Sequence, residues 1–326
     1  MKFRKFSNTG WLVSEVGLGC WALGGGWTDV SDKNAQEILK TAFDKGVNFF
    51  DTADVYGDGR SEKLIGKFIK SISERVYVTT KVGMRLKPHV PDEYTLENFE
   101  KFIDRSLLNL KVETIDLLQL HCPPSQLCSK KEIYEMMDEF VKKGKINYYG
   151  VSVFNLSEAM DAIKFPNVKS IQIVFNIFRQ KPIESFFEEA RKNNIAIIAR
   201  GPLASGLLTG TINEKTQFSP NDHRSYNKNG TSFDIGDTFS GINLTSGFEA
   251  VKRLKKILPK YYSLTDLALK WILMHDEVNV IIPGATNKFQ VMMNVRASDK
   301  ENIEDLLPKI KSIYEELIKP DVHKRW

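Results

Sequence analysis

Cysteines and long apolar runs are both scarce in this sequence. It contains only Cys20, Cys122 and Cys128, and no CxxC or HxxxH spacing accompanies them. A zinc site is therefore not expected, and so few cysteines favour a reducing compartment over a disulfide framework. No apolar stretch reaches the roughly 18 residues of a membrane span, and the N-terminus lacks the apolar segment of a signal peptide. We expect a cytoplasmic protein with no membrane span and no metal.

An excess of charge of one sign is also lacking. The chain has 46 basic and 41 acidic residues, which gives a formal net charge of +5. A nucleic-acid-binding protein more often gathers its basic residues in runs with interleaved aromatic residues. The densest basic stretch, residues 252–256, alternates with apolar residues at helical spacing and is typical of a solvated helix face. We therefore expect no nucleic-acid partner.

Eight short apolar runs rich in Val, Ile, Phe and Tyr are distributed along the chain. They lie at residues 16–19, 47–51, 76–81, 115–121, 146–152, 170–175, 195–200 and 278–284. Amphipathic helical patterns separate them. One covers residues 31–46, with Ser31 or Asp32 as its N-cap and Gly46 just past its end. Another begins at Ser263 with a Ser-x-x-Asp cap.

Strands that alternate with amphipathic helices predict parallel βαβ units. Eight such units with no break in composition predict one domain over residues 1–326, a closed (β/α)₈ TIM barrel. A doubly wound open sheet is the alternative. The first residues, 2–16, alternate around an Asn-Thr-Gly turn and predict a β-hairpin.

Two regions fall outside this alternation. Residues 201–245 form a connection rich in Gly, Ser, Asn and Thr, and so long a loop is uncommon unless it is functional or disordered. The C-terminal region carries one more amphipathic helix, at residues 302–318, and ends in His-Lys-Arg-Trp. This tail either folds back toward the barrel rim or frays.

Polar residues end three consecutive apolar runs. The second run ends at Asp51, with Tyr56 in the loop that follows, the third at Lys81 and the fourth at His121. In a (β/α)₈ barrel the carboxyl ends of the strands meet at one rim, where active sites lie. Alone, each residue could be a turn cap, a solvated strand end or a structural histidine. Together they indicate a catalytic site.

The loop after Asp51 contains features that suit such a site. Gly57 and Gly59 permit a turn that aims Tyr56 back over the barrel mouth, and Ser61 is expected to cap the next helix.

The four side chains make chemical sense as a proton-donating site. A phenol has an ordinary pKa near ~10, and an adjacent ammonium such as Lys81 is expected to lower it. Asp51 would keep Lys81 charged, and His121 would hydrogen-bond a carbonyl oxygen. Tyr56 would then protonate that oxygen as a hydride reaches the carbonyl carbon. A lyase that uses Lys81 as a Schiff-base amine is an alternative, but it needs a neutral lysine.

A Rossmann fingerprint does not account for the hydride donor. Gly17, Gly19 and Ala22 formally match GxGxxA, but Gly24–Gly26 and Trp27 follow in place of an apolar helix. Other loops of the barrel would have to hold the cofactor.

Six sequence blocks occur in an order that resembles the aldo-keto reductase superfamily. They are DTADVYGDGRSEKLIG, TTKVG, LLQLHCP, GVSVFN, ARGPLASGLLTG and IPGATNKFQVMMN. The resemblance extends from the N-terminal hairpin to about residue 297. It implies a barrel whose bottom is closed by the hairpin, with NADPH, less readily NADH, extended across the rim and a small carbonyl compound as substrate. Asp51, Tyr56, Lys81 and His121 correspond to the family's catalytic tetrad, with Tyr56 as the general acid.

The resemblance also implies a set of binding residues. Ser152 and Gln172 would anchor the nicotinamide carboxamide, and Arg200 takes the place of an aromatic residue stacked on that ring. Gly201, Pro202, Leu203, Ser205 and Gly206 would cross the pyrophosphate, and Gly284, Thr286, Gln290 and Asn294 would hold the adenosine end. Gly19, Cys20, Trp21 and Asp51 would line the cofactor, Arg224 and Lys288 would favour its 2′-phosphate, and Trp21, Trp27, Tyr56 and His121 would meet the substrate.

The sequence departs from the family at several places. Val153 replaces the usual Asn or Arg, and the charge of Arg200 is expected to favour NADPH over NADP⁺. His89, His223 and His275 carry no partner signal and are expected to be surface or structural residues. A non-catalytic NADP-binding partner subunit remains the alternative function, because some relatives serve ion channels in that way. The sequence gives neither the physiological substrate nor the oligomeric state.

Overall fold

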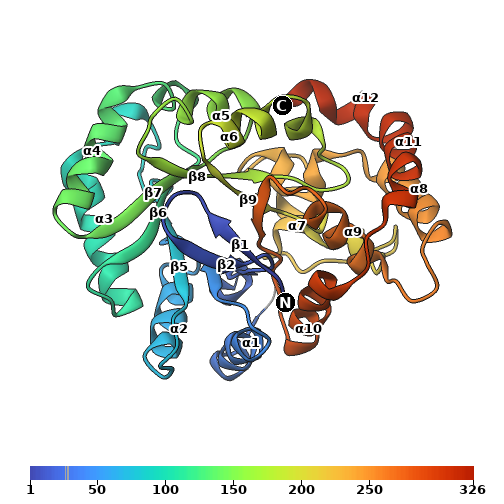
Figure 1. The fold of residues 1–326 in the computed structure, drawn as a ribbon, viewed down its shortest axis with the longest axis horizontal. Coiled ribbons are helices and arrows are strands. Elements are labelled where there is room, and N and C mark those ends of the chain that lie inside the picture. The colour runs from blue at the N-terminus through green and yellow to red at the C-terminus, as the bar shows by residue number, and fades with distance from the viewer. Residues whose placement is uncertain (26, 28) are drawn as a thin grey trace.

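The computed structural model describes residues 1–25, 27 and 29–326 (Figure 1). Eight parallel strands in this part of the chain lie side by side in sequence order. They are β3 (Leu18–Gly19), β4 (Phe49–Asp51), β5 (Tyr77–Val82), β6 (Ile115–His121), β7 (Ile146–Ser152), β8 (Val168–Val174), β9 (Ala196–Arg200) and β10 (Val278–Ile281). Parallel bridges from Val16 to Ile281 and from Gly19 to Gly284 bring the last strand back to the first. The predicted (β/α)₈ barrel is confirmed, and the open-sheet alternative is wrong.

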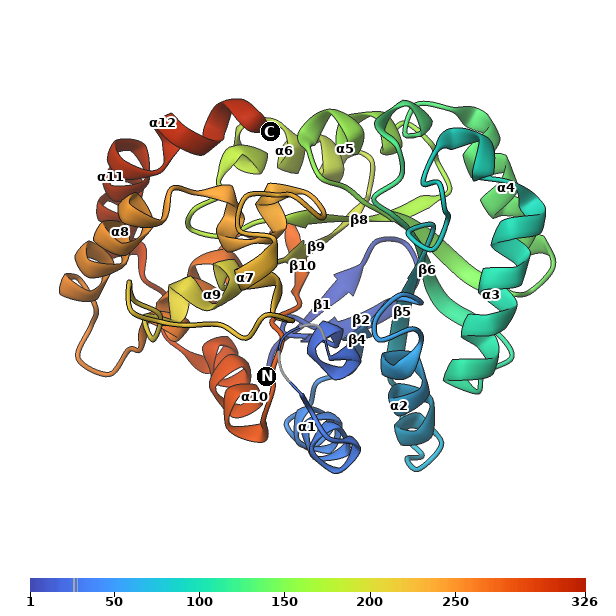
Figure 2. The same cartoon turned by 180° about the vertical axis from the view of Figure 1, so that it is seen from behind.

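The strands are buried on both faces because helices surround the barrel (Figures 1 and 2). The main helices are α1 (Asp32–Asp44), α2 (Arg60–Ile69), α3 (Leu96–Leu110), α4 (Lys131–Lys142), α5 (Leu156–Ala162), α6 (Phe186–Lys192), α8 (Leu244–Lys256), α9 (Leu264–Leu273), α10 (Lys288–Val295) and α11 (Leu307–Leu317). Ser31 caps α1, and Ser263 and Asp266 form a capping box at α9, as the sequence predicts. No helix in the described ranges is long and apolar enough to cross a membrane.

The N-terminal hairpin, β1 (Phe3–Phe6) and β2 (Trp11–Ser14), lies across one opening of the barrel (Figure 1). Phe6 and Val13 are fully buried against a set of barrel residues, Phe49, Leu117, Ala196, Ile198, Val280 and Ile282. The ring of Trp11 stacks on Tyr77, with centroids 4.5 Å apart. Phe49 and Tyr77 are the first residues of their strands, so the hairpin closes the amino-terminal end of the barrel and leaves the opposite rim for function.

Arg4 connects this hairpin to the end of α9. Its guanidinium pairs with Glu15 at 2.9 Å and donates hydrogen bonds to the carbonyl oxygens of Leu273, His275 and Val278. The last carbonyls of a helix have no partner within the helix. Arg4 therefore donates hydrogen bonds to unpaired carbonyl oxygens at the C-terminal end of α9. Its positive charge is favourable there because that end of a helix dipole is negative.

The long connection at residues 201–245 is folded. It contains the 3-10 helices η5 (Ala204–Thr209), η6 (Ile235–Asp237) and η7 (Phe239–Gly241) and the short helix α7 (His223–Tyr226).

The C-terminal tail, α12 (Lys319–Val322) and η10 (His323–Arg325), docks against this connection. Arg325 donates to the Gly241 carbonyl at 2.6 Å, and the buried ring of Trp326 stacks on the guanidinium of Arg179. The alternative of a frayed C-terminus is therefore wrong.

We predict that Arg4→Met lowers the free energy of unfolding by about 2–4 kcal/mol, because it leaves the buried Glu15 without its cation and three carbonyl oxygens without the guanidinium donor. Urea unfolding followed by circular dichroism measures the change. Lys5→Met is the matched control, since Lys5 lies on the same strand with an exposed side chain, and we expect a change within about 0.5 kcal/mol. Equal unfolding midpoints for the two variants would contradict this role of Arg4.

Candidate active site

The structure brings the four predicted catalytic residues together at the rim. Lys81 Nζ donates to Asp51 Oδ1 at 2.6 Å and to the Thr52 carbonyl at 2.7 Å, and lies 3.4 Å from the Tyr56 hydroxyl. The rings of Tyr56 and His121 meet edge to face with centroids 6.0 Å apart. Lys81 and Asp51 are buried, with side chains 1% and 4% exposed. A carboxylate, an ammonium, a phenol and an imidazole thus form one contiguous group.

Strand register explains why these residues meet. Asp51 ends β4 and His121 ends β6, and Lys81 is the next-to-last residue of the strand between them. The chain that leaves β4 continues beside β5, with hydrogen bonds from the Thr52 N–H to the Thr79 carbonyl and from the Asp54 N–H to the Lys81 carbonyl.

The loop that carries Tyr56 is packed against the loop after β3. A Cβ atom at Gly57, whose φ is +60°, would lie 2.3 Å from the Gly24 carbonyl oxygen, so only glycine fits. Ser61 is not the helix cap that the sequence predicts, because α2 begins at Arg60 after Gly59. The Ser61 hydroxyl instead donates to the Cys20 carbonyl and accepts from Thr52, which joins the two loops.

The charges of the site follow from burial and pairing. Burial disfavours the charge of Lys81, but Asp51 and Tyr56 outweigh it, and the pKa of Lys81 is raised. Burial also raises the pKa of Tyr56, and Lys81 only limits that rise. Lys81 thus lowers the pKa of Tyr56 as predicted, but burial outweighs it and the net shift is upward. Burial, then Lys81 and Arg200, hold the pKa of His121 well below its usual range, so this imidazole is neutral near pH 7.

Asp51 is held by more than Lys81. Its Oδ2 atom accepts hydrogen bonds from Gln172 Nε2 at 2.7 Å and from Gln119 Nε2 at 3.3 Å. The role of Gln119 was missed by the sequence analysis, although it lies two residues before His121 on the same strand. The carboxylate is therefore fully engaged and fixed in orientation.

Aromatic residues cover the site. Trp21 stacks near Tyr56 with centroids 6.1 Å apart and meets Trp27 edge to face at 5.6 Å. His223 lies between the two indoles, 4.7 Å from Trp21 and 4.6 Å from Trp27. His223 is fully buried, so it is not a surface residue. In the sequence, only its position next to Arg224 in the long connection indicated that it could lie near the site. The structure thus brings together all four residues predicted to meet the substrate.

His89 and His275, the other two histidines expected to be surface or structural residues, also contact neighbouring side chains. His89 Nε2 lies 2.7 Å from the Tyr94 hydroxyl, and His275 packs against Phe175 and Trp271. Both therefore agree with a structural role.

Arg200 is paired with an acid that the sequence analysis missed. Its guanidinium forms an ion pair with Asp237 and donates to the Val153 carbonyl at 2.9 Å. Asp237 lies in η6, far along the chain, so no local pattern could have indicated it. The expected preference for NADPH over NADP⁺ assumed an unpaired charge at Arg200, and this pairing removes its basis.

Ser152 and Gln172 lie opposite each other in the register of β7 and β8. The only contact of the Ser152 hydroxyl within the described residues is a long one, 3.7 Å, to Cys122 Sγ. Gln172 uses its amide N–H₂ on Asp51, and its amide oxygen makes no hydrogen bond to another described residue. A hydroxyl donor and an amide acceptor side by side fit a carboxamide, so these residues suit a nicotinamide.

The other residues predicted to bind the cofactor form a continuous arc. Gly19 pairs with Asp51 and bridges to Gly284, and Asn294 Nδ2 donates to the Gly284 carbonyl at 3.1 Å. Gly201, Pro202, Leu203, Ser205 and Gly206 follow β9 directly. The side chain of Cys20 is fully buried, so only its backbone can line a cofactor.

Several of these side chains are engaged within the protein. Gln290 accepts from the Thr286 N–H, and Lys288 pairs with Glu37 at 2.7 Å. Arg224 pairs with Asp222 at 2.6 Å. The Ser205 hydroxyl donates to the Asp237 carbonyl and accepts from the Phe239 N–H, so it holds the long connection in place. Lys288 and Arg224, the two residues predicted to favour the 2′-phosphate, therefore have partners already.

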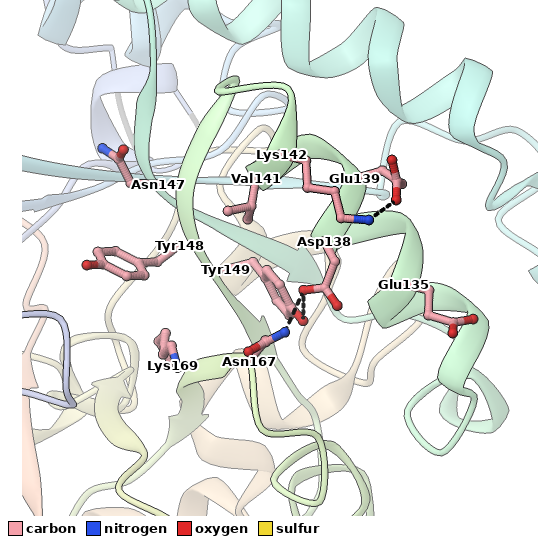
Figure 3. Close-up of a pocket in the computed structure, with 10 residues that line it drawn as sticks. All are labelled: Glu135, Asp138, Glu139, Val141, Lys142, Asn147, Tyr148, Tyr149, Asn167 and Lys169. Carbon is pink, nitrogen blue, oxygen red and sulfur yellow. Dashed lines mark hydrogen bonds and ion pairs between the residues drawn. The ribbon is translucent and has the colours of Figure 1, made fainter.

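A surface pocket of about 600 Å³ lies elsewhere, beside α4 and the start of β7 and β8 (Figure 3). Its central carboxylate, Asp138, accepts hydrogen bonds from Tyr149 and Asn167, and Lys142 pairs with Glu139. None of the predicted site residues lines it. Most polar groups of this pocket thus have partners on the protein, and the rim remains the candidate active site.

Comparison with known proteins gives a consistent result. Residues 15–315 match the model of the family described as "Aldo/keto reductase family". The chain is 32% identical to "Aldo-keto reductase YhdN" of Bacillus subtilis, over 89% of this chain and 87% of that protein. It is 28% identical to "Aldo-keto reductase yakc [NADP(+)]" of Schizosaccharomyces pombe, over 86% and 82%. The holo structure of aldo-keto reductase AKR11C1 from Bacillus halodurans superposes with a TM-score of 0.76 at 26% identity, covering 98% and 97%.

We predict that Lys81→Met lowers the free energy of unfolding by about 3–5 kcal/mol, because it leaves the buried Asp51 carboxylate without its cation. Denaturant unfolding of the wild type and the variant measures this difference.

Lys270→Met is a matched control. Lys270 is buried in α9 but has no ion pair within the ranges described, and burial together with Lys2 and Arg4 lowers its pKa. We expect its replacement to leave the unfolding midpoint unchanged or raise it. If both variants lost the same free energy of unfolding, the pairing of Lys81 with Asp51 would not explain the loss in Lys81→Met.

Proposed function

Because the chain belongs to the aldo/keto reductase family, whose members are NAD(P)H-dependent oxidoreductases, we propose that it reduces aldehydes or ketones with NADPH. One observation carries this proposal. The ammonium of Lys81 lies between the Asp51 carboxylate and the Tyr56 hydroxyl, at the rim where a carbonyl group would meet a cofactor. Such a group can deliver a proton to an oxygen and stabilise the phenolate that remains.

Bound NADPH would supply the hydride. Tyr56 is the general acid, and it donates its hydroxyl proton to the carbonyl oxygen of the substrate. Lys81, 3.4 Å away, stabilises the resulting phenolate, and Asp51 keeps Lys81 charged and oriented. His121 is neutral because its pKa is low, so it can orient the carbonyl oxygen through a hydrogen bond without competing as an acid.

Ser152 and Gln172 would hold the carboxamide, and the arc from Gly201 to Gly206 and from Gly284 to Asn294 would carry the rest of the cofactor. The name of the Schizosaccharomyces pombe relative, with its NADP(+), supports NADPH over NADH. Lys288 and Arg224 would reach the 2′-phosphate only by exchanging Glu37 and Asp222 for it. Small carbonyl compounds are the proposed substrates, and the free cysteines agree with action in the cytoplasm.

Two alternatives are weaker on the geometry. A Schiff-base lyase needs a neutral Lys81, but Asp51 raises the pKa of that lysine despite its burial. A non-catalytic partner subunit does not require the 3.4 Å approach of Lys81 to Tyr56. Turnover of a generic aldehyde with NADPH separates an enzyme from such a subunit.

We predict that Tyr56→Phe lowers kcat for aldehyde reduction by about 10²- to 10⁴-fold, because the variant has no proton to donate. The dissociation constant for NADPH, from fluorescence titration, should change little. Tyr149→Phe is the control, since this buried tyrosine lies in the pocket of Figure 3, away from the rim, and bonds Asp138. Full activity in Tyr56→Phe would exclude the proposed acid.

A second prediction concerns the charge of Arg200. Asp237→Asn should weaken NADP⁺ binding relative to NADPH by roughly 3- to 30-fold, because an uncompensated guanidinium repels the oxidised, positively charged ring. Calorimetric titration with both cofactors measures the ratio.

Asp222→Asn is the matched control for that ratio. It frees Arg224 on the same connection, but both cofactor forms carry the 2′-phosphate, so their affinities should change by one common factor. A shift of the ratio in Asp222→Asn, or none in Asp237→Asn, would refute the argument.

A further inference from the structure

Asp54 is a fully buried acid, two residues before Tyr56, that the proposed mechanism does not use. No described protein group completes a hydrogen bond to either of its carboxyl oxygens, although the Val55 N–H is near enough to favour the charged form weakly. A buried carboxylate normally has a cation or several donors, because burial without them is very unfavourable. Asp54 therefore requires a different explanation.

The nearby arginines do not pair with it. Arg85 and Arg105 both bind Asp58, an exposed acid on the same loop, at 2.7 and 2.9 Å. Arg85 also donates to the backbone carbonyl of Asp54 at 3.1 Å, and Arg105 Nη1 is buried without a described partner. These two arginines lower the pKa of Asp58. The outer acid thus has both cations, and the inner acid has none.

The neighbour of Asp54 on α2 is another buried carboxylate, Glu62. It accepts hydrogen bonds from Thr80 Oγ1 at 2.6 Å and from Asn109 Nδ2 at 2.9 Å, so its carboxylate oxygens both have donors. A second negative charge beside it, away from water, would be repelled. Of the two acids, Asp54 is the one whose carboxyl oxygens have no described donor, so burial disfavours its charge.

The backbone of Asp54 is part of the catalytic geometry. Its N–H donates to the Lys81 carbonyl at 3.2 Å, and the next turn begins with the hydrogen bond from the Tyr56 N–H to the Ala53 carbonyl at 3.1 Å. A movement of Asp54 toward water would therefore pull both the Tyr56 turn and its connection to β5.

We propose that Asp54 is a positioning residue for Tyr56. While its carboxyl group is neutral, Asp54 holds the turn that carries Tyr56, and when the carboxyl group ionises, that turn is released. The proposal rests on the proposed function of Tyr56. It gives the enzyme an alkaline limit that originates in Asp54 and not in the catalytic tetrad.

The titration behaviour of the surroundings agrees with this role. Burial first, and then Glu62, raise the pKa of Asp54 to about 8, against the opposing influence of Arg85 and Arg105. Among the described residues, Tyr94, directly after η2 (Pro91–Glu93), also faces Asp54, and its pKa is raised by burial. Tyr56 and Lys81 both have raised pKa values, so their own ionisations lie above their ordinary ranges.

The pH profile of kcat/KM for aldehyde reduction tests the proposal. In the wild type we expect it to fall about tenfold for each pH unit above about 8. Asp54→Asn, an uncharged residue of the same shape, should retain near-wild-type activity at pH 7 and lose this alkaline fall. Asp116→Asn is the matched control, because Asp116 is a buried acid with a raised pKa near the start of β6, at the end of the strand opposite His121. The pH profile of Asp116→Asn should follow that of the wild type.

Infrared spectroscopy observes the carboxyl group of Asp54 directly. The difference spectrum between wild type and Asp54→Asn should show the carbonyl stretch of a protonated carboxyl at pH 7, and this band should disappear above about pH 8. If Asp54→Asn does not fold, the same band should be followed in the wild type alone across this pH range. An unchanged alkaline fall in a folded Asp54→Asn, or no such band, would overturn the proposal.

Failure of the proposed function has a different signature. If the wild type reduces no carbonyl compound, the position of the Tyr56 turn is read from the fluorescence of Trp21, whose ring lies 6.1 Å from Tyr56. Subtracting the signal of Trp21→Phe isolates it. A change through about pH 8 that is absent in Asp54→Asn supports the role of Asp54, and a flat titration overturns it.

Discussion

The ion pair between Lys81 and Asp51 is the interaction on which the rest of the site depends. A buried pair is stable only when further hydrogen bonds satisfy the atoms that the partner leaves free. Here the Thr52 carbonyl completes the ammonium, and Gln119 and Gln172 complete the carboxylate. These groups come from β4 and the residue after it, β5, β6 and β8, and only a closed barrel brings β8 within reach of β4. The fold is thus a requirement of this ion pair, because an open sheet would leave Asp51 short of partners.

The same balance of charge recurs around the rim. Arg200 pairs with Asp237, and Arg85 and Arg105 share Asp58, so each of these three cations is paired with an acid. Asp54 is the exception, and it avoids the penalty of an unpaired buried charge by remaining protonated. Asp54 and Asp58, four residues apart on one loop, therefore differ in charge. The difference arises because Asp58 is exposed and paired with the arginines, whereas Asp54 is buried and is not.

The sequence predicted the barrel, its hairpin and the meeting of Asp51, Tyr56, Lys81 and His121 at the rim, because each depends on local information. Strand ends follow from apolar runs, and strand order follows from the alternation with helices. The pairing of Arg200 with Asp237 and the burial of His223 depend on how the connection at residues 201–245 folds, which no periodic pattern encodes. Ser61 was assigned to a helix cap because the loop-to-loop contact through Cys20 could not be seen. The lowering effect of Lys81 on the Tyr56 pKa was predicted because it is local, whereas the larger, opposing effect of burial is a property of the whole rim.

The C-terminal tail has a direct structural connection to the charge at the rim. Asp237 reaches Arg200 because the surrounding segment is fixed by Ser205 and by the hydrogen bond from Asn176 to Ser240. Trp326 packs on the same segment so closely that a Cβ atom at Gly241 would lie 2.9 Å from its ring. The last residue of the chain, held by Arg179, therefore supports the loop that neutralises Arg200. Because Arg200 in turn influences the pKa of both His121 and Tyr56, the docking of the tail and the acid-base balance of the site belong to one connected structure.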